Sequence, residues 1–195
     1  MLTAGIQFDE AQIRKAFTAL SGIPGGAETA VCRAINRAVD RGKTQTVREI
    51  CSQYNIKPSQ VRSHMRVLRA TRANLSAVIL QTGSPLELMI FARKPKKPPK
   101  QKGVEVSART KVVAGVHFGV FKTLPHVFVA KMSNGHIGIY SRKGTKTLPI
   151  EQKYTTSVPQ MMKNAKVMDR LVEAAQKVMT AELDRQIELL LTQRR

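Results

Sequence analysis

The residues best suited to a chemical task form a run of cations between positions 93 and 102. Three of these ten residues are proline, none is acidic, and six are cationic: Arg93, Lys94, Lys96, Lys97, Lys100 and Lys102. Lysine and arginine bind phosphate and carboxylate through charge-assisted hydrogen bonds. Prolines favour an extended, semi-rigid arm over a helix. The run therefore predicts an exposed loop that contacts an anionic partner, and the alternative is a solvated loop without a partner.

A second set of basic residues precedes this run. It comprises Arg62, Arg66, Arg69 and Arg72. Arg62 and Arg66 fall, with His64, on a short predicted helix within 58–67 that Pro58 begins, and a single basic helix is weak evidence for recognition of a nucleic acid. We expect these arginines to contact the anion if the run at 93–102 does not.

The positive charge is concentrated in one region of the chain. Residues 50–168 hold twenty-one lysines and arginines against three acids, which gives +18 of the chain's net +20. The segments on either side are nearly balanced. A region with this charge repels itself unless an anion neutralises it. Nucleic acid, an acidic protein and a membrane surface are the candidate partners. The prolines disfavour a basic membrane helix, and no apolar run approaches the roughly 20 residues of a membrane span, so we expect no membrane partner.

The acids and histidines of the middle region are poorly placed for catalysis. Hydrolases that act through metals or paired carboxylates need several acids close together, whereas Glu87, Glu105 and Glu151 are far apart in the sequence. The four histidines lack metal-ligand spacing. His126 and His136 could face each other on neighbouring strands, but polar residues on a half-exposed sheet are the favoured interpretation. We predict no catalytic residue, metal or cofactor. A hydrolase that gathers acids around Glu87 or Glu105 is a remote alternative.

Few features indicate that the protein reads a nucleic-acid sequence. Aromatic residues make up 5% of the chain and tryptophan is absent, although single-strand recognition commonly uses aromatic side chains as stacking platforms. Any contact with nucleic acid is therefore predicted to be independent of sequence and directed at phosphate.

The two cysteines indicate a reducing compartment. Cys32 and Cys51 fall on one predicted helix, nineteen residues or roughly 28 Å apart, whereas a disulfide needs Cα atoms within about 7 Å. We expect two small buried thiols. The first residues do not resemble a signal peptide, so synthesis in the cytoplasm is the default expectation.

Apolar periodicity predicts the elements that position these residues. Residues 9–20 and 27–54 have helical spacing, and the longer stripe runs from Val31 through Ile50 to Tyr54. Strands are expected at 75–81 and 86–91 with a turn at 83–85, and weaker strand signals cover 104–113 and 116–121. Residues 157–192 are predicted to form one amphipathic helix, which begins with a capping box of Ser157 and Gln160.

A β-hairpin is the clearest strand signal. Asn134-Gly135 lies between two strand-like runs at 126–132 and 136–140, and this dipeptide favours a two-residue turn. Such a turn sets Met132 opposite Ile137 and Ala130 opposite Ile139. The sequence as a whole predicts an α+β fold in one domain over 1–195: a long N-terminal helix, a mainly antiparallel sheet region at 75–141 with the basic loop, and a long C-terminal helix.

The hairpin and the segments around it resemble the minor tail protein Z family of tailed bacteriophages, the tail-completion proteins. The likeness rests on 127–132, on Asn134-Gly135-His136, on 140–142, on Leu148-Pro149-Ile150 with Tyr154, and on 157–161, and it extends to Ala34-Ile35-Asn36-Arg37-Ala38 in the long helix. Where such proteins have Gly-Pro before the Ser-Val-Pro element, this chain has Thr155-Thr156.

The resemblance implies a non-enzymatic virion protein at the head-proximal end of the tail. It would form a ring of several copies at the head–tail junction, expected to be a hexamer because tail tubes usually have that symmetry. Its partners would be other tail or neck proteins, and its basic surface would face virion DNA or an acidic neighbouring ring. The alternative is a cytoplasmic, sequence-independent nucleic-acid-binding protein that forms no ring.

Overall fold

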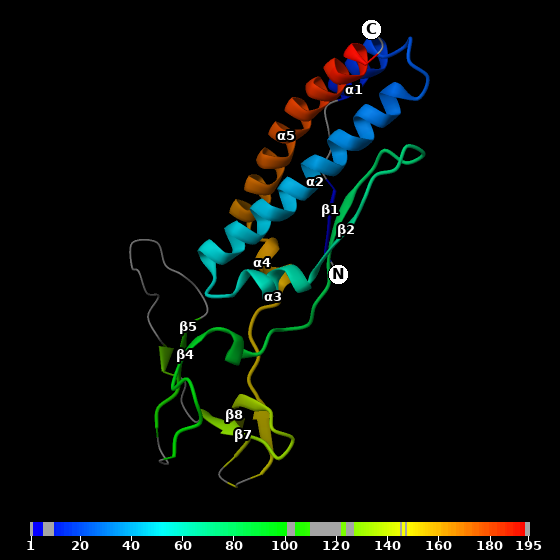
Figure 1. Cartoon of the computed structure of the whole chain (residues 1–195). Coiled ribbons are helices and arrows are strands. Elements are labelled where there is room, and N and C mark those ends of the chain that lie inside the picture. Colours follow the sequence, from blue (N-terminus) through cyan, green and yellow to red (C-terminus); the bar gives the residue numbers. More distant parts are fainter. Residues whose placement is uncertain are drawn as a thin grey trace.

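The computed structural model describes residues 2–5, 10–100, 104–109, 122–123, 127–144, 146 and 148–193. Two long antiparallel helices form the upper part of the molecule with a small sheet beside them, and two further sheets lie below (Figure 1). Each of the three sheets has three strands. This arrangement confirms the predicted α+β class.

The helices follow the predicted apolar stripes closely. They are α1 at Glu10–Ala19, α2 at Gly26–Gln53, α3 at Pro58–Ser63, α4 at Val158–Met162 and α5 at Ala165–Thr192. The chain enters α2 through Gly25, whose φ of 67° lies in the left-handed region that glycine adopts without strain. Pro58 occupies the first turn of α3, where its missing N–H costs nothing. The first residue of the predicted helix at 9–20, Asp9, lies outside the described residues.

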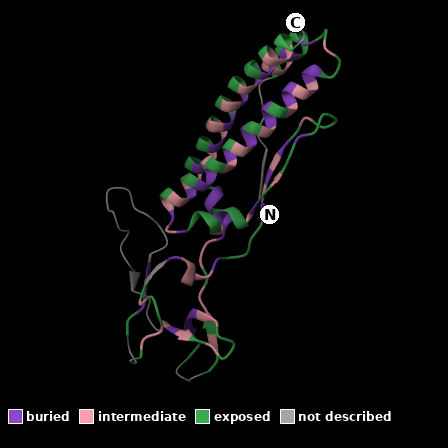
Figure 2. Ribbon diagram, viewed as in Figure 1, coloured by how far each residue is buried: buried purple, intermediate pink, exposed green. Residues whose placement is uncertain are grey.

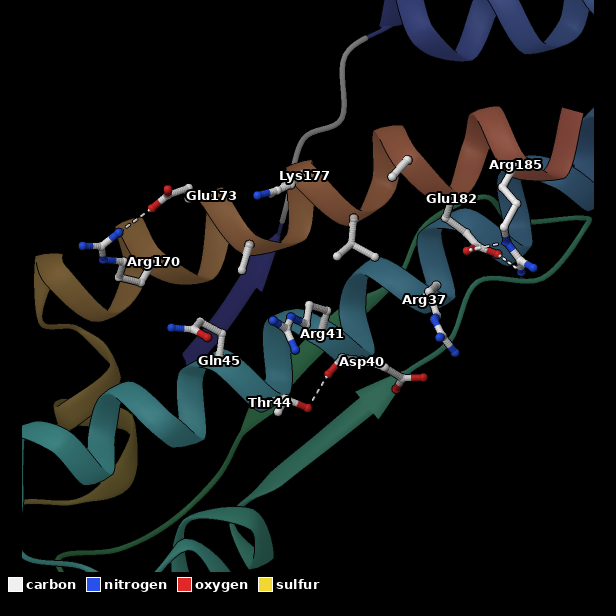
Figure 3. Close-up of a pocket in the computed structure, with 13 residues that line it drawn as sticks. Arg37, Asp40, Arg41, Thr44, Gln45, Arg170, Glu173, Lys177, Glu182 and Arg185 are labelled. Atoms are coloured by element: carbon white, nitrogen blue, oxygen red, sulfur yellow. Dashed lines mark hydrogen bonds and ion pairs between the residues drawn. The ribbon is translucent and has the colours of Figure 1, made fainter. Parts of the chain in front are cut away.

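The core of the upper part is formed between α2 and α5, which lie side by side (Figure 3). Ala30, Ala34 and Ala38 of α2 are fully buried, and their small side chains let α5 approach. Leu171 and Met179 of α5 fill the space on the other side of the contact. Figure 2 shows the buried residues on the inner faces of the pair and exposed ones on the outer faces.

The predicted single helix at 157–192 is wrong, because the segment forms two helices. The capping box starts α4 as expected: the Ser157 N–H donates to Gln160 Oε1 at 2.9 Å, and the Gln160 N–H to Ser157 Oγ at 3.4 Å. The chain then breaks at Asn164, whose Oδ1 accepts from the Lys166 N–H at 3.1 Å and caps α5. Its Nδ2 donates to Gln53 Oε1 at 2.7 Å, which ties the break to the end of α2.

The sheet beside α2 contains two strands that the sequence did not predict, at Leu2–Gly5 and at Met65–Leu68. Its order is β1-β3-β2, with β1 at Leu2–Gly5, β2 at Met65–Leu68 and β3 at Val78–Gln81, and both pairings are antiparallel. The predicted strand at 75–81 thus begins only at Val78. Gln81 is fully buried in the centre of this sheet, and neither its side-chain nitrogen nor its oxygen has a hydrogen-bond partner.

The predicted strand at 86–91 is also wrong, since Leu88–Ile90 forms the 3₁₀ helix η1. Leu86 and Phe91 pack into the core of the long helices, whereas Leu88 packs into a separate, smaller core. Side chains directed to two cores cannot lie on the two faces of one flat strand. The predicted turn at 83–85 is absent as well, since residues 82–86 form no turn. The chain passes between the two cores here, paired with the returning segment through Glu87 and Tyr154.

The smaller core lies between the other two sheets, which we call the β lobe; the rest of the described chain is the helical body. One sheet has β4 at Ala92–Lys94, β5 at Ser107–Arg109 and β6 at Lys122–Thr123 in the order β4-β5-β6. The other has β7 at Val127–Lys131, β8 at Ile137–Arg142 and β9 at Ile150–Gln152 in the order β7-β8-β9. Of the strand predicted at 104–113, residues 104–109 are described and contain β5, and the strand predicted at 116–121 lies outside the described residues.

The β7–β8 hairpin forms where predicted but in a different register. Lys131 pairs with Ile137 and Val129 with Ile139, one residue away from the predicted pairs. The cause is a longer turn: the Gly135 N–H donates to the Met132 carbonyl at 2.9 Å, and Gly135 has a φ of +82°. A turn followed by a left-handed glycine closes a three-residue loop. This register directs Val129 and Ile139 together into the small core.

Candidate anion-binding surface

The arginine strip, Arg62, Arg66, Arg69 and Arg72, lies along the outside of the helical body. Arg62 is in the last turn of α3, and Arg66 is on β2, where it points away from the core that buries Met65. All four arginine side chains are exposed. The alternation of β2 therefore presents Arg66 outward, together with the exposed Leu68, while Met65 and Val67 pack on the core.

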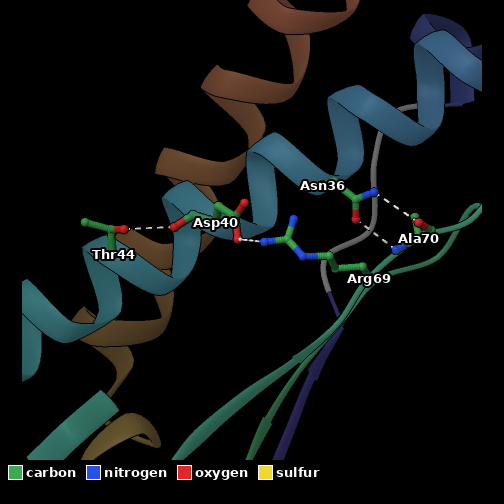
Figure 4. Close-up of polar contacts among 5 residues, drawn as sticks. All are labelled: Asn36, Asp40, Thr44, Arg69 and Ala70. Carbon is green, nitrogen blue, oxygen red and sulfur yellow. Dashed lines mark hydrogen bonds and ion pairs between the residues drawn. The ribbon is translucent and has the colours of Figure 1, made fainter. Parts of the chain in front are cut away.

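A polar clamp between α2 and the end of β2 positions the last two arginines (Figure 4). Asn36 Nδ2 donates to the Ala70 carbonyl at 3.0 Å, and the Ala70 N–H donates to Asn36 Oδ1 at 2.9 Å. Arg69 forms an ion pair with Asp40 of α2 at 3.0 Å, with half-exposed side chains. An exposed pair of this kind contributes at most about 1 kcal/mol. Among the described residues, Arg62, Arg66 and Arg72 contact no carboxylate.

The basic run at 93–102 begins inside a strand, which corrects the prediction of a loop over its whole length. Arg93 and Lys94 belong to β4 and pair with Ala108 and Ser107 of β5. The side chains of Lys94, Lys96, Lys97 and Lys100 are exposed, as the sequence predicts. The Arg93 side chain and Lys102 lie outside the described residues.

The structure does not bring the two predicted sets together. The arginine strip lies on the sheet beside α2, and the run at 93–102 extends from β4 in the β lobe (Figure 1). An anion that contacts both must be long, or must belong to a surface that faces the whole length of the molecule.

Sequence reasoning missed a third group of cations, on the β7-β8-β9 sheet. It comprises Lys131, Arg142, Lys143 and Lys146, all exposed. The Arg142 guanidinium lies over the Phe128 ring, 4.8 Å from its centroid. Lys143 is 3.5 Å from Glu151. The sequence does contain a signal for this group, because Arg142 and Lys143 are adjacent and Lys146 follows shortly after them.

Two acids of the middle region, Glu87 and Glu151, have different partners in the structure. Glu87 Oε2 is 3.5 Å from His136 Nε2, and this ring nitrogen is also 3.1 Å from the Gln152 amide. Glu151 contacts Lys143 elsewhere on the same sheet. Within the described residues, no three histidines, cysteines or carboxylates are grouped to hold a metal ion. His126 lies outside them, so its pairing with His136 is not described.

Both cysteines are free and half-buried. The Cys32 thiol donates to the Ala70 carbonyl at 3.3 Å, beside the polar clamp. Burial raises the pKa of Cys51, although the charge of Arg62 opposes this effect. A thiol with a raised pKa is a weak nucleophile at neutral pH. Cys51 is therefore suited to packing rather than to chemistry.

Among the described helices, none has an apolar stretch long enough to cross a bilayer.

A comparison with protein families identifies one that covers nearly the whole chain. The model of the prophage minor tail protein Z family matches residues 12–194. No curated protein matches the chain, and neither does any solved structure.

Proposed function

Because the chain belongs to the prophage minor tail protein Z family, we propose that it completes the head-proximal end of a phage tail as a ring of several copies, expected to be six. Membership of this family assigns the chain to the tail of the virion as a structural protein. In the proposed ring, the helical body makes the contacts between subunits and the basic surfaces face DNA or an acidic neighbouring ring. The role requires no enzyme activity.

The separation of charge from the main core supports this proposal. Lysines and arginines concentrate between residues 50 and 168, in the arginine strip and the β lobe, whereas α2 and α5 are nearly balanced. Cations without a base-reading element contact phosphate in any sequence. A protein that surrounds or abuts packaged DNA needs this kind of contact. The family match is the observation that carries the proposal.

The ring and its position can be tested on particles. We expect antibody-labelled tails to carry the protein at the end that joins the head, and purified protein to sediment as a closed oligomer. A monomer at high concentration that is absent from purified tails contradicts the proposal. If that protein still binds DNA, the alternative of a free, sequence-independent nucleic-acid-binding protein replaces it.

The basic surface can be tested with two variants that remove equal charge. One replaces Lys94, Lys96, Lys97 and Lys100 with glutamine, and the other replaces Arg62, Arg66, Arg69 and Arg72. Each phosphate contact contributes about 0.9 to the slope of log affinity against log salt for duplex DNA. The set whose loss flattens the slope more is the set that contacts phosphate. Unchanged slopes in both variants exclude DNA contact through either set.

A further inference from the structure

A groove runs along the outer side of the helix pair, and its lining residues all come from α2 and α5 (Figure 3). Its volume is about 780 Å³. The α5 side contributes Ala174, Val178 and Ala181, which lie on one stripe of the helix. Small side chains at these positions leave the hollow open and give it an apolar floor.

The three carboxylates of the groove are each held by an arginine. Asp40 pairs with Arg69 at 3.0 Å, Glu173 with Arg170 at 2.9 Å, and Glu182 with Arg185 at 2.6 Å. The hydrogen bond from Arg185 is the main cause that lowers the pKa of Glu182, and the charge of Arg37 adds to this effect. Each carboxylate of the groove therefore already has a cation of this chain beside it.

Among the described residues, three cations of the groove form no ion pair, and of these Arg37 lies near enough to Glu182 for its charge to lower the pKa of that carboxyl. Arg41 on α2 and Lys177 on α5 both line the groove and are exposed. In the part of the chain that the structure describes, neither contacts a carboxylate. The groove thus combines an apolar floor with positive charge from both walls that the chain's own acids do not neutralise.

We propose that this groove binds an amphipathic helix from a neighbouring virion protein, with glutamates or aspartates along one edge and small apolar residues along the other. A helix that lies in a groove between two others buries its apolar stripe on the floor. The segment of α5 from Arg170 to Arg185 spans roughly 22 Å, enough for about four turns of a partner. Carboxylates of that helix would reach Arg41 and Lys177.

Duplex DNA fits this groove less well than an acidic helix does. Asp40, Glu173 and Glu182 lie among the cations and would repel an evenly charged phosphate backbone, whereas a helix can place its carboxylates only where the cations are. The inference goes beyond the proposed ring and does not require it, because the groove belongs to a single subunit.

A synthetic helix tests the groove directly. The probe is a labelled, end-capped peptide of eighteen residues with glutamate at every fourth position and alanine elsewhere, measured by fluorescence anisotropy against the full-length protein at about 50 mM salt. The variant Arg41→Glu with Lys177→Glu is expected to weaken binding at least tenfold. The matched variant Arg48→Glu with Lys166→Glu changes the net charge equally at exposed positions outside the groove, and is expected to weaken binding less than threefold.

A second variant tests the floor without changing charge. Ala181→Trp fills the hollow and is expected to weaken binding at least fivefold, with circular dichroism unchanged. Equal losses in the two charge variants, or no binding by the unmodified protein, overturn the proposal. So does a groove variant that loses affinity for a twenty-base-pair duplex as strongly as for the peptide, because the groove would then be a phosphate site.

Discussion

The helical body and the β lobe stabilise themselves in different ways. The helical body has two 28-residue helices and a continuous core in which Ala34, Leu171 and Ala175 are fully buried. The described β lobe has strands of two to six residues around a core of five buried side chains, Leu88, Val106, Ala108, Val129 and Ile139. A three-stranded sheet is stable only through a packed hydrophobic face, and the described hydrophobic core of the β lobe is much smaller than that of the helical body. The helix pair therefore supplies most of the stability.

The same two regions differ in charge. Residues 82–157, which contain the β lobe, hold fourteen lysines and arginines against three acids, whereas α5 and the residues around it are balanced. Self-repulsion of this size opposes compaction. If the basic surface contacts an anion as proposed, its charge lies where little burial is at stake, and we expect the lobe to gain stability when an anion neutralises it.

The largest expected loss of stability follows the removal of a core side chain from the helix pair. Leu171→Ala leaves a cavity between α5 and α2 and should lower the free energy of unfolding by about 3 kcal/mol. Urea unfolding followed by circular dichroism measures this loss. Leu148→Ala, at a side chain that is 68% exposed, is the control and should change little.

The corresponding change in the β lobe should be smaller and confined to it. Ile139→Ala should cost about 2 kcal/mol, because the exposed surroundings of a small core relax more easily. Hydrogen exchange should speed up in β7 and β8 while exchange in α2 stays slow. A uniform increase over the whole chain would show that the two regions unfold as one unit, as the single-domain prediction requires.

Substitution of Gln81, a buried polar residue of the helical body, should raise the free energy of unfolding instead of lowering it. Gln81→Met removes two buried side-chain atoms without hydrogen-bond partners and should stabilise the protein by roughly 1.5 kcal/mol. Gln186 is the matched control, because its amide accepts from Arg33 at 3.2 Å and donates to Glu182 at 2.8 Å. Gln186→Met should therefore destabilise. Thermal unfolding of the two variants shows whether the missing hydrogen-bond partners of the Gln81 amide lower the stability of the protein.

A substitution in the hairpin turn of the β lobe should have a smaller effect on stability. Gly135→Ala places a Cβ at a φ of +82° and should cost about 1 kcal/mol. Gly144→Ala is the matched control, since nothing lies within 4 Å of its added Cβ and no positive φ constrains it. Hydrogen exchange of the Val129 and Ile139 amides measures the difference in local stability between the two variants. Equal behaviour of the two variants contradicts the observed turn.

The smallest expected effect depends on pH and belongs to the helical body. The folded pKa of Glu182 lies below its ordinary value of 4.5, so its pairing with Arg185 stabilises the protein above that pH and loses its contribution as the pH falls through the lowered pKa. Glu182→Gln should cost roughly 0.5 kcal/mol at pH 7, since Arg185 is largely exposed, and nothing near pH 2. Glu173→Gln, in a pair whose side chains are 60% and 68% exposed, is the control and should cost less at pH 7.

Periodicity and capping were sufficient to predict the helices, because both signals are local. The stripe of α2 and the capping box of Ser157 and Gln160 required no knowledge of the rest of the chain. The break at Asn164 was missed, since it depends on a hydrogen bond to Gln53, which is distant in sequence. The strand β1 at Leu2–Gly5 was missed because four residues carry little periodicity.

The β lobe was harder to predict because its elements depend on two separate cores. Residues 86–91 have the composition of a strand, but Leu88 and Phe91 belong to different cores and the chain turns between them. The register of the hairpin depends on its turn. The predicted two-residue turn requires positive φ at both Asn134 and Gly135, whereas the observed three-residue loop places Gly135 in the left-handed region. For the candidate surface, the sequence identified the cations but not their placement in separate regions of the molecule.

The pairing of α2 with α5 also sets the order in which the protein can fold during synthesis. The alanines of α2 meet their partners only after Leu171 and Met179 have left the ribosome, on the order of ten seconds later at ordinary translation rates. Until then the apolar stripe of α2 is uncovered, and the most basic part of the chain emerges before the main core can close. Slowed translation between residues 54 and 164 should therefore increase aggregation, whereas slowing before residue 26 should have no effect.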